Sequence, residues 1–342
     1  MSDKQDHSEE ELFEHYRLKA DPGQEPLRID KFLMDRIPNT SRTKLQAVAY
    51  NGGIKVNEKS VKPNFKIKPG DEISVVLPYP IREIELIPED IPLEILYEDE
   101  DVIVLNKQAG IVVHPGYGNY TGTLVNALVY HFGQLPDKGD HEDPRPGLVH
   151  RLDKKTTGIM VIAKTEHALT HLAKQFFDRT IDRRYAAIAW GDIAEDGTVE
   201  GHIGRSLKNR KVMTVFPEAD YGKHAITHYK VIQRLGYVTH VECKLETGRT
   251  HQIRVHLKHI GHTLFGDDEY GGNKVLKGTI FSKYKRFVEN CFDILPRQAL
   301  HAKSLEFDHP TSGERMKFEK EIPSDMQQVL ERWENYIQSR QD

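Results

Sequence analysis

The sequence is poor in cysteine, with only Cys243 and Cys291 among 342 residues. Two cysteines cannot build the disulfide framework of a secreted domain or a cysteine-based zinc module. This usage fits a reducing cytoplasm, where we expect the protein to act. Long apolar runs are also missing, and the polar, acidic N-terminus is unlike a signal peptide. We therefore expect neither a membrane span nor secretion.

An overall excess of positive charge is absent too, because the formal net charge is -4. The charge is unevenly distributed, however. Residues 28–77 contain ten basic and five acidic side chains, whereas residues 1–26 contain three basic and eight acidic ones. Phosphate responds to the local field, so the net charge does not exclude a nucleic-acid partner for residues 28–77. The alternative is that these cations only form a solvated surface.

Composition and length predict two folded domains, one flexible tail and one linker. Residues 1–25 are polar and acidic, so we expect a flexible tail. Residues 26–78 read as a small α/β domain, and residues 79–94, rich in proline and acids, read as a linker. Residues 95–342 then form the large domain.

The small domain carries two predicted helices. Apolar spacing indicates a helix from Leu27 to Leu33, and Ser41 is placed to cap a second one. The pattern RIDKFL…SRTKLQ…GGIKVNEKSVKPNFKIKPGD resembles the S4 RNA-binding domain. The resemblance implies RNA contacts from the cations of the two helices, which are Arg28, Lys31, Arg42 and Lys44.

The large domain is organised around the stretch HRLDKKTTG, residues 150–158, which places an arginine and an acid two residues apart. An apolar run, residues 159–163, follows it. A strand beginning at Gly158 would hold the preceding loop rigidly, as a reactive carboxylate requires. Spacing alone fits a structural loop as well.

Three further features of the large domain carry polar candidates. A strand is predicted over residues 184–190, with Tyr185 near its start. The stripe Ile253, Leu257 and Ile260 predicts a helix, with Arg254 beside its core-facing side. Residues 204–211 form a basic loop that would contact phosphate if the partner is a nucleic acid. Its candidate contacts are Arg205, Lys208 and Arg210.

One cluster of residues could suggest a metal site. It combines several histidines with two acids downstream: His251, His256, His259, His262, Asp267 and Asp268. Their spacing matches no established ligand pattern, so we expect no metal. A metal-dependent hydrolase is accordingly the weakest of the functional alternatives.

Five segments of the large domain, in order, carry a family resemblance: AGIVVHPG, GLVHRLDKKTTGIMVIAKT, RRYAAI, ETGRTHQIRVHLKHIGHTLFGD and RQALHA. Together they resemble the RluA-type family of pseudouridine synthases. With the S4-like module ahead of them, the chain is most similar to the branch of that family that modifies large-subunit ribosomal RNA, the pseudouridine synthases C and D. The resemblance implies an α+β fold with a mixed, largely antiparallel sheet, flanking helices and an active cleft.

The resemblance also implies roles for individual residues. Asp153 corresponds to the catalytic aspartate, Tyr185 to the active-site tyrosine, and Arg254 to the arginine that pairs with the aspartate. Arg151 corresponds to the residue that fills the space left by a flipped uridine, and Ile253 to one that packs near the base. The remaining candidates for RNA contact in these motifs are His150 and Arg249.

The implied reaction makes sense of these residue types. A carboxylate that attacks the substrate or takes a proton must be ionised, and a neighbouring cation favours the charged form. No step requires a metal or a cofactor. We expect a monomer that modifies large-subunit ribosomal RNA, free or in a precursor particle. The alternatives are a synthase directed to transfer RNA and a non-catalytic RNA-binding factor in ribosome assembly.

Overall fold

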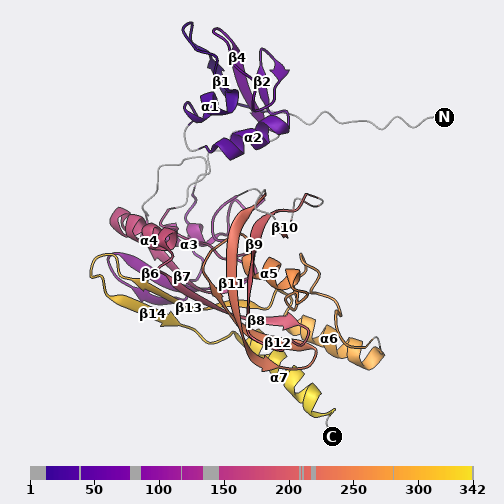
Figure 1. Cartoon of the computed structure of the whole chain (residues 1–342). Coiled ribbons are helices and arrows are strands. Elements are labelled where there is room, and N and C mark those ends of the chain that lie inside the picture. Colours follow the sequence, from indigo (N-terminus) through magenta and orange to yellow (C-terminus); the bar gives the residue numbers. More distant parts are fainter. Residues whose placement is uncertain are drawn as a thin grey trace, which may run out of the picture. The chain divides into compact units, whose positions relative to one another are not determined.

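The computed structural model describes residues 13–37, 40–77, 86–116, 118–133, 146–207, 209, 212–216, 221–279 and 281–340. They divide into two compact units, one reaching residue 77 and one starting at residue 86 (Figure 1). No helix among these residues is long and apolar enough to cross a membrane.

The N-terminal unit packs two helices against an antiparallel sheet with the strand order β1-β4-β2-β3. Its elements are β1 (Phe13–Lys19), α1 (Ile29–Met34), α2 (Arg42–Tyr50), β2 (Ile54–Val56), β3 (Lys59–Ser60) and β4 (Glu72–Leu77). The expected cap is confirmed, because the Ser41 hydroxyl accepts a hydrogen bond from the Lys44 amide at 3.2 Å. Phe32, Leu45 and Ile73 lie in one buried cluster between helices and sheet.

The expectation of a flexible tail is wrong where the structure describes it, because β1 pairs with the edge of β4 from Phe13↔Leu77 to Lys19↔Glu72. Tyr16 and Leu18 pack against the buried cluster of the unit. A polar, acidic composition hid this short apolar alternation. Residues 1–12 lie outside the described residues.

The expected linker is corrected in a similar way. Residues 79–85 lie outside the described residues, but residues 86–94 are held against α3 (Leu124–Phe132). The Asn126 side chain donates to the carbonyl of Ile87 at 2.8 Å, and the Glu89 amide donates to the carbonyl of Asn126 at 3.1 Å. Leu86 and Leu93 pack on the core, so this stretch belongs to the large unit.

The large unit is built on one ten-stranded sheet with the order β10-β9-β11-β12-β8-β13-β7-β6-β5, and β14 pairs with β13. All pairs are antiparallel except β13 with β7. The strands are β5 (Ile95–Glu98), β6 (Val102–Lys107), β7 (Thr157–Ala163), β8 (Asp182–Trp190), β9 (Gly197–Arg205), β10 (Met213–Phe216), β11 (Lys223–Arg234), β12 (Val238–Leu245), β13 (Leu300–Asp308) and β14 (Arg315–Glu319). This confirms the expected α+β class with a mixed, largely antiparallel sheet.

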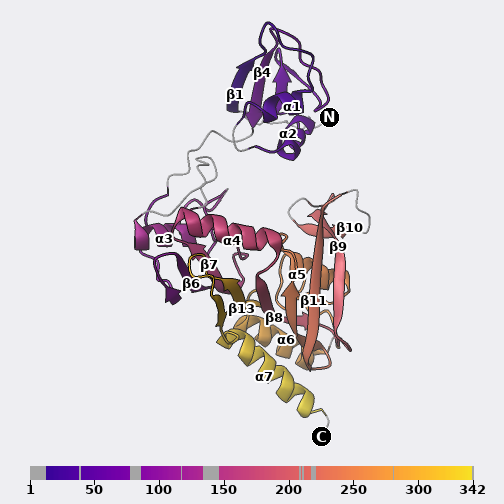
Figure 2. The same ribbon diagram turned by 60° about the vertical axis from the view of Figure 1, so that its left-hand side comes forward.

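Helices cover both faces of this sheet. Besides α3, they are α4 (Glu166–Asp178), α5 (Gln252–His259), α6 (Ser282–Ile294) and α7 (Ser324–Gln338). Neighbouring residues of a strand point to opposite faces. Thus Tyr185 and Ala187 of β8 join the cluster with α3 and α5, whereas Ala186 and Ile188 join the one with α6 and α7. Figure 1 shows α6 and α7 close to β8 and β12, and Figure 2 shows α6 beside β8 from another side.

Steric crowding explains why the central motif, residues 150–158, ends in a glycine. Gly158 adopts a φ of 123°, and a Cβ there would lie 2.3 Å from the carbonyl oxygen of Ala302. The parallel pairing of β7 with β13 needs this close approach. The Thr157 hydroxyl also lies 2.8 Å from Nδ1 of His301. The loop ahead of β7 therefore ends on a rigid junction, as the motif predicts.

Candidate active site

A cleft of about 440 Å³ opens over the face of the sheet that carries α5. It is lined by residues 149–153, the end of α4, the start of β8 and the turn from β12 into α5. Asp153 lies in it with a side chain that is 20% exposed. Two hydrogen bonds fix the loop of Asp153. The carbonyl of the next residue, Lys154, accepts them from the Gly110 amide and from Nζ of Lys107.

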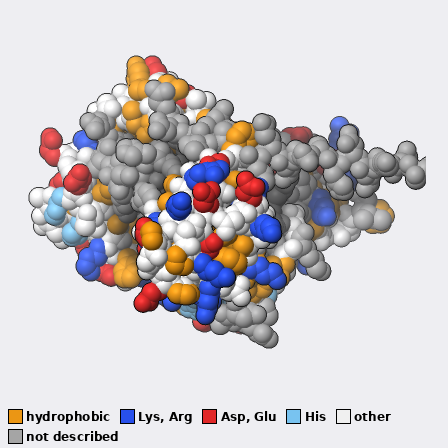
Figure 3. All heavy atoms as spheres, turned by 90° about the horizontal axis from the view of Figure 1, so that it is seen from above, with side chains coloured by type: hydrophobic (Ala, Val, Ile, Leu, Met, Phe, Trp, Pro, Cys, Tyr) orange, Lys and Arg blue, Asp and Glu red, His pale blue; other side chains and the backbone are white. Residues whose placement is uncertain are grey.

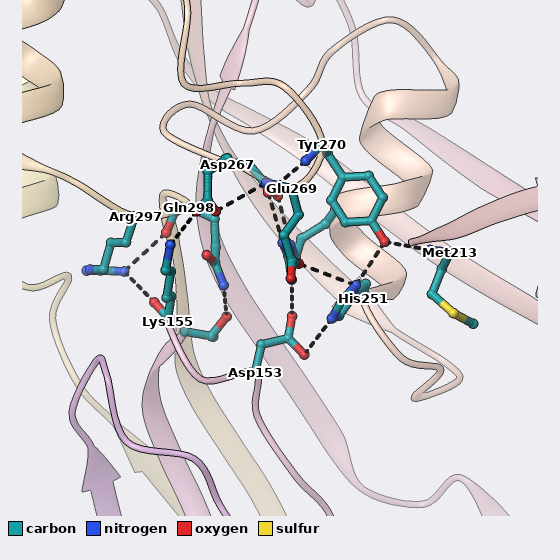
Figure 4. A network of polar contacts seen from close by, with 12 residues as sticks. Asp153, Lys155, Met213, His251, Asp267, Glu269, Tyr270, Arg297 and Gln298 are labelled. Carbon is teal, nitrogen blue, oxygen red and sulfur yellow. Dashed lines mark hydrogen bonds and ion pairs between the residues drawn. The ribbon is translucent and has the colours of Figure 1, made fainter. Parts of the chain in front are cut away.

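The predicted pair of Asp153 and Arg254 is present. Nη1 of Arg254 donates to Oδ2 of Asp153 at 3.0 Å, across 101 positions of sequence. Arg254 lies in the first turn of α5 and is only 3% exposed. Figure 4 shows Asp153 at the edge of the network to which this pair belongs.

Arg254 is itself clamped by two acids. Its Nε and Nη2 donate to the two carboxylate oxygens of Asp267 at 2.7 and 2.8 Å, and Nη2 also reaches Glu269 at 2.5 Å. Burial works against the charge on Arg254, but the hydrogen bonds and negative charge of Asp267 outweigh it and raise the pKa of the guanidinium. The cation facing Asp153 is thus permanently charged and fixed in orientation.

His251 adjoins the other oxygen of Asp153. Its Nε2 lies 3.8 Å from Oδ1 of Asp153, and its Nδ1 lies 2.8 Å from the hydroxyl of Tyr270. Since this hydroxyl accepts a hydrogen bond from the Met213 amide at 3.0 Å, its own hydrogen is available for Nδ1. Burial is the main cause that lowers the pKa of His251, so the neutral ring is favoured.

Tyr185 and Ile253 form the apolar wall of the cleft. Tyr185 is 7% exposed and Ile253 is 3% exposed, and both line the cavity. Burial raises the pKa of the Tyr185 hydroxyl, so it stays protonated at neutral pH. A flat, neutral ring beside a carboxylate offers a surface on which a nucleobase can stack.

The three other predicted contacts of the cleft differ in their surroundings. Arg151 is exposed at the mouth, with Nη1 3.3 Å from Nε2 of His114. Arg249 is half-buried and donates through Nε to the carbonyl of His224 at 3.0 Å. His150 has a structural partner, since its Nε2 accepts a hydrogen bond from the Val161 amide at 3.1 Å.

The ring of His150 also stacks on Phe176, with centroids 4.8 Å apart. Burial is the main cause that lowers the pKa of His150 to about 3. The neutral ring of His150 accepts a hydrogen bond from β7 and so helps to fix the loop, which leaves only Nδ1 as a polar atom for a contact with RNA. Contact between His150 and RNA stays a prediction without support from this geometry.

The cations of the small unit fall into two pairs. Arg28 and Arg42 both donate to Asp30, a fully buried acid, at 2.9 to 3.0 Å, and so contribute to the fold. Lys31 and Lys44 are exposed, and neither pairs with an acid among the residues that the structure describes. In the view of Figure 3, Lys and Arg side chains lie in several groups with acidic and hydrophobic ones between them.

Of the basic loop, Arg205 is exposed at the end of β9. Lys208 and Arg210 lie outside the described residues.

Several residues of the site escaped sequence reasoning. Asp267 and His251 belonged to the suggested metal cluster, but both oxygens of Asp267 bind Arg254. Within the described ranges, no three His, Cys, Asp or Glu side chains are grouped as metal ligands. Lys107 was missed because a lysine in an apolar strand gives no signal of its surroundings. Burial lowers the pKa of this lysine to about 7, against the opposing charge of Asp153.

Comparison with known proteins agrees with the resemblance. A family model described as RNA pseudouridylate synthase matches residues 101–259, and the S4 domain model matches residues 27–73. An uncharacterised RNA pseudouridine synthase of Chlorobaculum parvum is 48% identical over 92% of this chain and 96% of its own length. The ribosomal large subunit pseudouridine synthase D of Zymomonas mobilis is 44% identical over 88% of this chain and 92% of its own.

A solved structure shares the fold. Human RNA pseudouridylate synthase domain containing 1 aligns with a TM-score of 0.50 and 26% identity, covering 67% of this chain and 83% of that protein. The chain therefore belongs to the RNA pseudouridine synthases, which are isomerases. Its match to the S4 domain model lies in the N-terminal unit.

Proposed function

We propose that the chain converts uridine to pseudouridine in large-subunit ribosomal RNA, with Asp153 as the catalytic carboxylate and the target uridine flipped into the cleft. The relative from Zymomonas mobilis is named for the large ribosomal subunit. The observation that carries the proposal is the 3.0 Å contact between Arg254 and Asp153 inside a cleft walled by Tyr185. Such a substrate places the reaction in the cytoplasm.

The two oxygens of Asp153 have different surroundings, which suits a reactive carboxylate. Nη1 of Arg254 donates to Oδ2. Oδ1 lies 3.8 Å from Nε2 of His251, and no shorter ion pair of Oδ1 is found among the described residues. Oδ1 is therefore the oxygen available to a substrate. Because the guanidinium is itself fixed by Asp267, the carboxylate is held ionised and oriented before RNA binds.

The reaction breaks the bond between N1 and C1′ of uridine and forms a bond between C5 and C1′. The proton on C5 is lost and N1 gains a proton, so the product is an isomer and no electrons are exchanged. Oδ1 of Asp153 either attacks the sugar or the base, or removes a proton in an elimination route. Each route starts from the ionised carboxylate.

Tyr185 and Arg151 complete the proposal. The ring of Tyr185 stacks on the base, and its hydroxyl relays the proton that leaves C5, accepting that proton as it releases its own to solvent. Flipping a base out of a stack costs a few kcal/mol, which contacts in the emptied space offset. Arg151, exposed at the mouth and long enough to reach RNA, supplies such contacts. The exposed Lys31, Lys44 and Arg205 add attraction to the phosphate backbone.

The test compares pseudouridine maps of total RNA from cells with the protein, without it, and with Asp153→Asn in its place. We expect specific uridines of large-subunit RNA to lose modification in the last two, while the purified variant folds and binds that RNA. If pseudouridine were lost only from transfer RNA, the substrate would be transfer RNA and not large-subunit ribosomal RNA. An unchanged map in cells without the protein would contradict the proposal.

A further inference from the structure

A second buried arginine lines the cleft, and no described acid pairs with it. Arg183 is two residues before Tyr185 on β8, so the alternation of the strand puts both side chains on one face. It is 9% exposed, and its buried Nε has no hydrogen-bond partner. Across the part of the chain that the structure describes, no hydrogen bond or ion pair is found for its guanidinium nitrogens.

The acids near Arg183 are already engaged. Asp182 points to the other face of β8, where Arg184 and Lys244 pair with it. Glu246, which also lines the cleft, lies 2.7 Å from Nε2 of His228. Among the described residues, Arg184 thus has acidic partners and the neighbouring Arg183 has none.

Other contacts hold the Arg183 guanidinium in place. It lies over the ring of Phe176, 5.3 Å from the centroid, and a Cβ at Gly248 would lie 2.8 Å from its Nη1. The glycine therefore leaves room for the head group. A guanidinium that is desolvated, positioned and unpaired is costly to a folded protein unless an anion binds to it.

Besides Arg151 at the mouth, two more arginines line the same cleft, Arg179 after the end of α4 and Arg249 before α5. The guanidinium fork suits phosphate oxygens better than a lysine does. We infer that Arg183, supported by the field of Arg179 and Arg249, binds a backbone phosphate next to the uridine that enters the cleft. This inference rests on the proposed function and assigns the cleft a phosphate subsite in addition to the network of Asp153 and Arg254.

The experiment uses the full-length protein and large-subunit RNA from cells that lack it. Binding is measured over a range of salt concentrations, together with single-turnover pseudouridine formation, for wild type, Arg183→Gln and Arg183→Lys. Arg184→Gln is the matched control, because it removes a neighbouring cation from the opposite face. We expect Arg183→Gln to weaken binding about tenfold or more and to reduce the slope of log K against log salt by about 0.7 to 0.9.

We expect Arg183→Lys to restore part of the affinity and Arg184→Gln to leave binding and rate unchanged. Without RNA, Arg183→Gln should unfold at the same temperature as wild type or higher, because it removes an unpaired buried charge. Gly248→Ala, which displaces Nη1 but keeps the charge, should weaken binding less than Arg183→Gln does.

An Arg183→Gln protein that unfolds earlier than wild type would show a structural role and overturn the inference. A wild-type salt slope in that variant would do the same. These results differ from a failure of the proposed function, in which the wild-type protein itself would form no pseudouridine in the RNA.

Discussion

The two units of the chain each contain a buried charge surrounded by opposite charges, with the signs reversed. In the small unit, Asp30 is fully buried and accepts hydrogen bonds from Arg28, Arg42 and Gln46. In the large unit, Arg254 is the buried ion, and Asp153, Asp267 and Glu269 surround it. The first centre joins two helices and the second supports a cleft.

The difference lies in what remains available after pairing. Around Asp30, both arginines bind the same carboxylate, and their side chains are only partly exposed to solvent. Around Arg254, Asp267 takes Nε and Nη2, and Nη1 donates to Oδ2 of Asp153 alone, so Oδ1 of Asp153 stays open to the cleft. Both centres have more outer charges than inner ones, so the distinguishing feature of the second is an outer carboxylate, Asp153, with one oxygen that Arg254 does not bind.

Removing the central cation of the large unit should have the largest effect. Arg254→Met leaves Asp267 buried without its partner, so we expect a loss of about 3–5 kcal/mol of unfolding free energy. Pseudouridine formation should fall below detection, because Asp153 loses the contact that orients it. Urea unfolding followed by the fluorescence of Trp190 and Trp333, both in this unit, measures the stability.

A double variant separates stability from catalysis. Arg254→Met with Asp267→Leu replaces the buried ion pair by apolar groups, which is often neutral or stabilising. We expect it to recover most of the lost stability and none of the activity. If activity returned with stability, the charge on Arg254 would have no part in the reaction.

The sequence allowed a prediction of the pair at the centre of the cleft but not of its supports. Asp153 and Arg254 stand in long motifs whose family resemblance implied their contact. The sequence suggested Asp267 only as a possible metal ligand. Its spacing cannot reveal that this acid, 13 positions after Arg254, accepts hydrogen bonds from that arginine. Arg183 and Lys107 gave no signal, since burial and lack of partners are properties of the packed sheet.

The small unit gave the opposite lesson. Its helices and the Ser41 cap followed from apolar spacing, because local sequence determines them. The roles of Arg28 and Arg42 did not, because basic residues on a helix look alike whether they face RNA or a buried acid. Likewise, β1 was missed since a strand at a sheet edge depends on a partner, β4, more than 50 residues away.

Removing the central anion of the small unit should have an intermediate effect. Asp30→Asn keeps the shape but leaves Arg28 and Arg42 without a charged acceptor, for a loss of about 1–2 kcal/mol, moderated because both arginines are partly exposed. Hydrogen exchange of α1 and α2 should speed up, while the tryptophan signal of the large unit stays unchanged. Protection that is unaltered in both helices would contradict this role for Asp30.

The same centre predicts a pH dependence. Burial tends to raise the pKa of Asp30, but the hydrogen bonds from Arg28, Gln46 and Arg42 outweigh it and lower the pKa. A carboxyl with a lower pKa in the folded state stabilises the fold above its unfolded value of about 3.9 and loses this contribution as the pH falls further. The protection of the small unit against hydrogen exchange, corrected for the intrinsic exchange rate at each pH, should therefore fall below about pH 4 in wild type, and less so in Asp30→Asn.

The smallest effect should come from an outer member of the Arg254 centre. Glu269 is 48% exposed, and solvent screens its contact with the guanidinium, which Asp267 already holds through two hydrogen bonds. We therefore expect Glu269→Gln to change the unfolding free energy by less than about 1 kcal/mol and the single-turnover rate by only a few-fold. A loss of activity comparable to that of Arg254→Met would contradict this. It would mean that Asp153, Asp267 and Glu269 are all needed to orient Arg254, so that none of the three carboxylates is left over for the substrate.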